Sequence, residues 1–215
     1  MSGANVDSKF VDACLRRILW PELSAIGFRR SGRTAWRDRP HAVQVVCIQS
    51  FNSYVAEGVG ATTFSFSVPI GVFYPVIEEF DPVPSFHGDP TRPAEWHCHA
   101  RNHLGKGISQ VGEWFPRPLR DRPEVWFVKP DGSNVEAVVT DARDRILEGG
   151  IPWLERLADL REARRAFSED PGRSLAFGLG GEDYGGSLGS PARFYAIEAL
   201  STLIDDPSQH DGSRG

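Results

Sequence analysis

The most regular hydrophobic pattern in the chain lies between residues 64 and 72. Large apolar residues alternate there with serine, proline and glycine, at Phe64, Phe66, Val68, Ile70 and Val72. A two-residue period predicts a β-strand with one buried face and one solvated face, as in antiparallel sheets. Because Pro69 cannot donate a ladder hydrogen bond, we expect this strand to lie at an edge or to be bulged there.

A hairpin and further strands are predicted around this pattern. Gly27 ends a helix, and the pair at 31–32 is typical of a tight turn between two short strands, the second of which contains residues 35–37. A β-branched run over residues 42–51 predicts another strand. Residues 124–128 predict one more buried strand.

Helical periodicity dominates the two ends of the chain. Residues 7–26 carry one apolar stripe at the helical spacing, and Pro21 is expected to bend or split that helix. Three more helices are predicted after residue 133. The first ends at Gly149-Gly150, the second opens at Pro152, and the third opens at Ser190.

The connections between these elements carry weaker signals. Residues 51–62 are predicted to form a loop, and residues 75–93 a proline-rich irregular connection. A short helix is expected within residues 94–105. The predicted fold class is α+β, with an antiparallel sheet of four to five strands packed against the N-terminal and C-terminal helices. Residues 1–206 are expected to form a single domain, with a disordered tail at 207–215.

The composition of the chain bears on its partners and on its cellular compartment. The 215 residues include 24 basic and 29 acidic side chains, so the net charge of −5 gives no nucleic-acid footprint. Three cysteines without CxxC spacing favour a reducing compartment. We find no signal peptide pattern and no apolar run long enough for a membrane span, so a cytoplasmic protein without membrane contact is expected.

Four segments together carry a family resemblance. They read GFRRSGRTAWR, FSFSVPIGV, WHCHARNHLG and VWFVKPDGSNVEAVVTDARDRILEGGIPWLERL. With them, roughly residues 10–165 resemble a bacterial family catalogued as domain of unknown function 4304. The resemblance implies a compact α+β domain and carries over no catalytic residue.

The predicted hairpin is strongly basic. Within eleven residues it holds five arginines and one acid, Asp38. Guanidinium groups beside an aromatic ring are suited to recognising phosphate or carboxylate groups. The alternative is a solvated face on which the arginine stems cover apolar surface. The predicted binding residues are Arg29, Arg30, Arg33, Trp36 and Arg37.

A second candidate is the segment from His97 to His103. On a helix, His99 and His103 would have the i, i+4 spacing of zinc ligands, but Ala100 stands where a zincin motif needs glutamate. We predict no metal and no cofactor. The alternative metal set is His87, His99 and His103. Cysteine catalysis, by Cys47 or Cys98 with a histidine, is the other alternative.

These observations favour a non-catalytic interaction module that binds a protein or another acidic partner through the basic hairpin. Nucleic acid is not expected as a partner. The alternative function is a small metal-dependent or cysteine-dependent enzyme that uses residues 97–103.

Overall fold

The computed structural model describes residues 8–80, 87–108, 110, 122–169 and 190–205. Their centre is a five-stranded antiparallel sheet in the order β1-β2-β3-β6-β7. Its strands are β1 (Arg29–Ser31), β2 (Thr34–Arg39), β3 (Ala42–Cys47), β6 (Pro69–Phe73) and β7 (Ala100–His103). A second sheet pairs β4 (Gln49–Ser50) with β5 (Phe66–Ser67). The predicted α+β class and the antiparallel sheet are confirmed.

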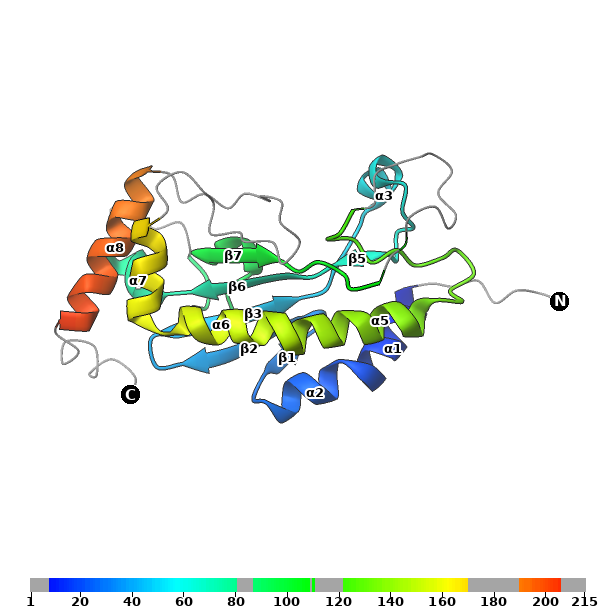
Figure 1. Cartoon of the computed structure of the whole chain (residues 1–215), viewed down its shortest axis with the longest axis horizontal. Coiled ribbons are helices and arrows are strands. Elements are labelled where there is room, and N and C mark those ends of the chain that lie inside the picture. Colours follow the sequence, from blue (N-terminus) through cyan, green and yellow to red (C-terminus); the bar gives the residue numbers. More distant parts are fainter. Residues whose placement is uncertain (1–7, 81–86, 109, 111–121, 170–189, 206–215) are drawn as a thin grey trace.

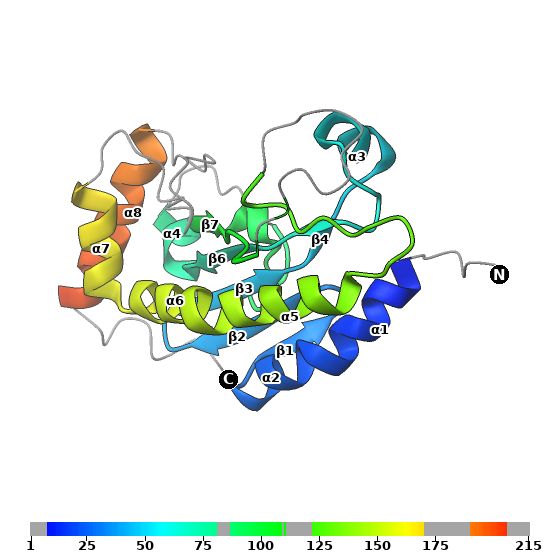
Figure 2. The ribbon, with the colours of Figure 1, turned by 45° about the vertical axis from the view of Figure 1, so that its right-hand side comes forward.

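The longer helices lie on one face of the sheet and at its ends. Figures 1 and 2 show α5 and α6 as one long rod along the sheet, with α1 and α2 beside it. Both figures place α7 and α8 together at one end of the sheet and α3 at the other. The helices are α1 (Ser8–Ile18), α2 (Trp20–Ala25), α3 (Ser53–Val59), α4 (Pro75–Phe80), α5 (Val135–Arg145), α6 (Ile151–Ala158), α7 (Leu160–Glu169) and α8 (Ser190–Asp205). A 3₁₀ turn, η1 (Glu95–His97), and a π-helical turn, η2 (Ile146–Gly150), complete them.

The main core lies between the helices and the sheet. Leu15 and Leu19 from the N-terminal helices are buried there with Phe66 and Ile70 of the strands. The predicted split of the first helix is confirmed, because α1 ends at Ile18 and α2 begins directly before a proline in its first turn. None of the helices in the described ranges is long and apolar enough to cross a membrane.

Two alternatives were predicted at Pro69, an edge position or a bulge, and the edge position is wrong. Strand β6 lies between β3 and β7, inside the sheet. The strand is interrupted at Val68, so Pro69 is the first residue of β6. At the first position of a strand, the backbone N–H that proline lacks is tolerated.

The solvated face predicted for this segment is also wrong, since all five residues of β6 are buried. Gly71 allows a second layer to approach the sheet on the face opposite the helices. A Cβ atom at Gly71 would lie 2.5 Å from Cβ of Cys98. Cys98, Val43, Val45 and Phe73 form a second buried cluster there.

Several predicted connections turn out to be regular. Residues 53–59 form α3, which is capped by the Asn52 side chain and ended by Gly60 in the left-handed conformation. Residues 75–80 form α4 rather than an irregular connection. The helix predicted within residues 94–105 is wrong, because this segment contains η1 and strand β7.

Three other predicted boundaries shift. The helical break at Gly149-Gly150 is wrong, because the chain passes through both glycines in the π-helical turn η2. The hairpin turn lies one residue later than predicted, at 32–33, with positive φ at Gly32. Residues 124–128 are buried, and their β-pairing with other described residues is a single isolated bridge between Phe66 and Trp126. The predicted tail at 207–215 lies outside the described residues.

Candidate functional site

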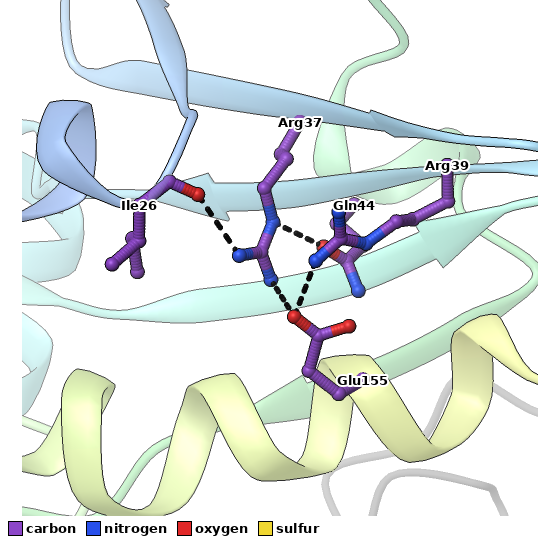
Figure 3. Close-up of polar contacts among 5 residues, drawn as sticks. All are labelled: Ile26, Arg37, Arg39, Gln44 and Glu155. Atoms are coloured by element: carbon purple, nitrogen blue, oxygen red, sulfur yellow. Dashed lines mark hydrogen bonds and ion pairs between the residues drawn. The ribbon is translucent and has the colours of Figure 1, made fainter.

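Arg37, at the centre of the basic hairpin, is a buried side chain. Figure 3 shows its guanidinium between β2, β3 and α6. Its Nε donates to Oε1 of Gln44 at 2.7 Å, Nη1 to the carbonyl of Ile26 at 3.0 Å, and Nη2 to Oε1 of Glu155 at 2.6 Å. The guanidinium also lies 4.5 Å from the ring centre of Phe28. Burial lowers the pKa of Arg37 although Glu155 opposes the change, and an arginine keeps its charge at neutral pH.

Arg39 and Arg33 are also held within the fold. Arg39 Nη2 donates to the same Glu155 oxygen as Arg37 does. Arg33 Nε forms an ion pair of 2.7 Å with Asp12 of α1, and its Nη1 donates to Ser50 Oγ in β4. These contacts join the hairpin to the elements around it.

Arg29 and Arg30 differ because they lie on the exposed strand β1. Arg29 forms an ion pair of 2.5 Å with Asp38, and both of these side chains are exposed. Arg30 lies over the Trp20 ring at 5.6 Å and donates to the carbonyl of Gly32.

The predicted binding residues therefore do not form one surface. Successive side chains of a strand point to opposite faces, so Trp36 and Arg37 are separated by the sheet. Trp36 is half-buried, and its Nε1 donates to the carbonyl of Pro93 at 2.7 Å. The exposed members are Arg29 and Arg30, which are neighbours in β1 but whose side chains lie on opposite faces of the sheet.

The histidines of the second candidate are spread out. His99 directly precedes strand β7 and His103 is its last residue, so the two histidines do not lie one helical turn apart. At about 3.3 Å per residue, an extended chain separates their positions by about 13 Å. His87 is exposed in an irregular segment. Within the described ranges, no three His, Cys, Asp or Glu side chains are grouped closely enough to hold a metal ion.

His99 makes a structural connection between two elements. Its Nδ1 accepts from the backbone N–H of Tyr74 at 3.0 Å, so its proton lies on Nε2, which contacts Glu78 Oε1 at 3.1 Å. Burial raises the pKa of the Cys98 thiol well above its usual range and also raises the pKa of Cys47. Both thiols are therefore protonated at neutral pH, which disfavours nucleophilic catalysis.

A cavity of about 270 Å³ lies beside α3, where β4, β5 and the end of β7 meet residues 122–125. His103 is the predicted site residue that lines it. The polar side chains Ser67, Arg122 and Glu124, which also line it, were not predicted. A signal for Glu124 was present in the sequence, because this acidic residue directly precedes a strongly apolar run.

The fold and these sites define a small α+β protein with a five-stranded antiparallel sheet and a basic hairpin at the edge of that sheet. The chain belongs to the family described as domain of unknown function DUF4304, whose model matches residues 19–156. Comparisons with curated proteins and with solved structures found no match.

Proposed function

We propose that this chain is a non-catalytic interaction module that binds an acidic segment of a partner protein along β1. The observation that carries the proposal is the exposed edge of the sheet. β1 pairs only with β2 among the described strands, and all three of its residues are exposed. An extended peptide can add to such an edge through main-chain hydrogen bonds.

The two exposed arginines fit an acidic peptide in that position. Arg29 is opposite Trp36 in the register and Arg30 is opposite Ala35, so the two side chains project from opposite faces of the sheet. A strand added to β1 also sends successive side chains to opposite faces. Two adjacent acidic residues could therefore pair with the two arginines, one on each face.

Charge in the hairpin supports the same partner. Five arginines are opposed by the three carboxylates that they contact, Asp12, Asp38 and Glu155, so the cluster keeps a charge of +2. Arg30 contacts none of these carboxylates, and no described acid lies within ion-pair distance of it. This local excess of positive charge, in a chain of net charge −5, favours the encounter with an acidic segment.

A photo-crosslinking residue in place of Ser31, on β1, would test the proposal in the native host. A matched probe in place of the exposed Ser168, on α7, is the control. We expect the β1 probe alone to capture a partner, with the crosslink in an acidic segment. Failure of the β1 probe to capture a partner, or equal capture by both probes, would contradict the proposal.

The captured partner then permits a quantitative test. Arg30→Glu should weaken its binding at least ten-fold at low salt, and the defect should shrink as salt screens the charges. Arg161→Glu, the same charge change at an exposed position of α7, should bind normally. Equal affinity of the two variants would remove β1 from the interface.

The alternative of an enzyme acting at residues 97–103 has less support. His99 is already engaged by Tyr74 and Glu78, and burial keeps the neighbouring Cys98 thiol protonated.

A further inference from the structure

The register of the basic hairpin determines which backbone groups of β1 face away from the sheet. Residues 32–33 form a two-residue turn, so the flanking residues Ser31 and Thr34 exchange both of their backbone hydrogen bonds. Bonded and non-bonded pairs alternate along an antiparallel ladder, and the next pair, Arg30 with Ala35, is therefore not bonded. The backbone N–H and C=O of Arg30 consequently point outward, away from β2.

The hairpin between β2 and β3 gives the same result independently. Its two-residue turn lies at 40–41, so Arg39 and Ala42 form its closing bonded pair. Every second pair from there is bonded, which includes Ala35 with Val46. Because Ala35 directs its backbone groups to β3, it cannot bond to Arg30 on its other side.

The outward edge of β1 is short. Two residues before Arg30, the N–H of Phe28 already donates to the carbonyl of Leu23 at 3.0 Å, where α2 ends. Two residues after Arg30, Gly32 begins the turn with a φ of 59°. Arg30 therefore presents an outward donor and an outward acceptor together, and neither bonds to another described residue.

An antiparallel peptide suits so short an edge better than a parallel one. In an antiparallel pair, one peptide residue exchanges both hydrogen bonds with the residue opposite to it. In a parallel pair the bonds are slanted, so the two groups of Arg30 would bond to two different peptide residues, and the pairing is slightly less stable per residue. We therefore expect antiparallel addition, with a single peptide residue bonded to Arg30.

The side chain of that peptide residue lies on the same face as the Arg30 side chain. On this face the Arg30 guanidinium contacts the Trp20 ring and the carbonyl of Gly32. The next peptide residue lies opposite Arg29, on the other face, where Asp38 already pairs with Arg29 at 2.5 Å. A carboxylate opposite Arg30 consequently gains more than one opposite Arg29.

We propose that β1 binds its acidic segment in the antiparallel direction and reads one acidic residue, the anchor, directly opposite Arg30. The N–H of the anchor donates to the C=O of Arg30, its C=O accepts from the N–H of Arg30, and its carboxylate pairs with the Arg30 guanidinium. This inference rests on the proposed function and adds to it the direction of the peptide, its register and the residue that specifies it.

NMR titration of the isotope-labelled whole chain with acetyl-Thr-Val-Glu-Val-Thr-amide tests the register. We expect saturable shifts of the Arg29, Arg30 and Ser31 amides. N-methylation of the glutamate removes the donor to Arg30 and should weaken binding about ten-fold. N-methylation of the valine that follows is the matched control, and it should change the affinity little because that N–H points away from β1.

The anchor is tested on both sides of the pair. With the unmodified chain, glutamine in place of the peptide glutamate should weaken binding about three-fold or more at low salt. With Arg30→Met, which keeps the backbone edge, the same replacement should make little difference. With Arg29→Met, the matched change on the other face, the preference for glutamate should remain.

The inference would be overturned by equal losses from the two N-methylated peptides, by a larger loss from methylation of the valine, or by the absence of saturable shifts on β1. Loss of the preference for glutamate in Arg29→Met rather than Arg30→Met would also overturn it. Crosslinking of an acidic segment to β1 alongside any of these results would uphold the proposed function and reject only this register.

Discussion

Arg37 illustrates how a buried cation can be part of a fold. Each branch of its guanidinium has an acceptor, and those acceptors come from a helix end, a neighbouring strand and α6. Arg29, eight positions earlier in the same hairpin, has one acidic partner and remains in solvent. The two arginines therefore contribute very differently to stability, although both lie in one basic stretch of sequence.

Arg37→Met should lower the free energy of unfolding by about 2–3 kcal/mol. Removing one partner of a buried pair costs about 3–5 kcal/mol, and the loss is smaller here because Glu155 is 42% exposed and can be hydrated. Arg29→Met, the matched control in an exposed pair, should cost about 0–1 kcal/mol. Urea unfolding followed by tryptophan fluorescence measures both, and equal losses would contradict a structural role for Arg37.

His103 should make stability depend on pH. Burial lowers its pKa, with a further contribution from Arg101, while Glu124 opposes the change. In the unfolded chain the pKa of this histidine is about 6.5. Below that pH the unfolded chain therefore takes up a proton more readily than the folded chain does. Stability is therefore complete above about pH 6.5 and falls as the pH decreases towards the lower pKa of the folded state.

The comparison of His103→Gln with the unmodified chain isolates this effect. Between pH 7.5 and 5.5, the urea midpoint of the unmodified chain should fall more than that of the variant. The other histidines are common to both proteins and cancel in the difference. Parallel declines would show that His103 titrates alike in both states.

At the scale of elements, the sequence predicted local structure better than pairing. Pro21 split the first helix as expected, and Gly27 and Gly32 take the positive φ values that turns need. The burial of both faces of β6 was not predicted, because it depends on β7 and Cys98, which lie outside the alternating sequence of residues 64–72. Prediction of the candidate site was limited for the same reason. Arg37 could be seen as basic, but its partner Glu155 lies 118 residues away.

At Gly71, the layer that contains Cys98 packs directly against the backbone of the sheet. Gly71→Ala would place Cβ within 2.5 Å of Cys98 Cβ and 2.8 Å of its Sγ. We expect a loss of about 1–3 kcal/mol, which is typical of overpacking. Cys98→Gly in the same chain should recover part of that loss, relative to Cys98→Gly alone.

Gly58→Ala, within α3, is the opposite case and serves as the control. Nothing lies within 4 Å of a Cβ atom there, and alanine favours a helix over glycine by about 0.5–1 kcal/mol. Chemical denaturation should show stabilisation by Gly58→Ala. A neutral effect of Gly71→Ala would mean that the layer containing Cys98 moves away without cost.

For the whole molecule, the family match ends before the hydrophobic core does. The match stops at residue 156, but Tyr74 of the sheet region donates to the carbonyl of Leu157 at 2.5 Å and packs edge-on against Phe167 of α7. Leu200 and Leu203 of α8 are buried in the same core. The last two helices are therefore part of the packing that holds the matched region.

A chain that ends at residue 169 should accordingly be unstable. It would uncover Phe167 and α4, so we expect a lower melting temperature and increased binding of a hydrophobic dye. A chain that ends at residue 206 is the control, and it should melt as the full chain does in one transition by fluorescence and circular dichroism. Normal melting of the shorter chain would show that α8 is dispensable.

The π-helical turn η2 restricts how the length of this protein can change. One residue corresponds to about 100° of rotation around a helix, so deleting Gly149 would turn Glu155 away from Arg37 and Arg39 while α5 stayed in place. Loops tolerate insertions and deletions, but the interval from Val135 to Glu155 lies in one continuous helical rod. Among members of the family that keep an acid opposite this arginine pair, we therefore expect gaps in an alignment to avoid the interval. Any gap that does occur there should be accompanied by a shift of that acid along the helix.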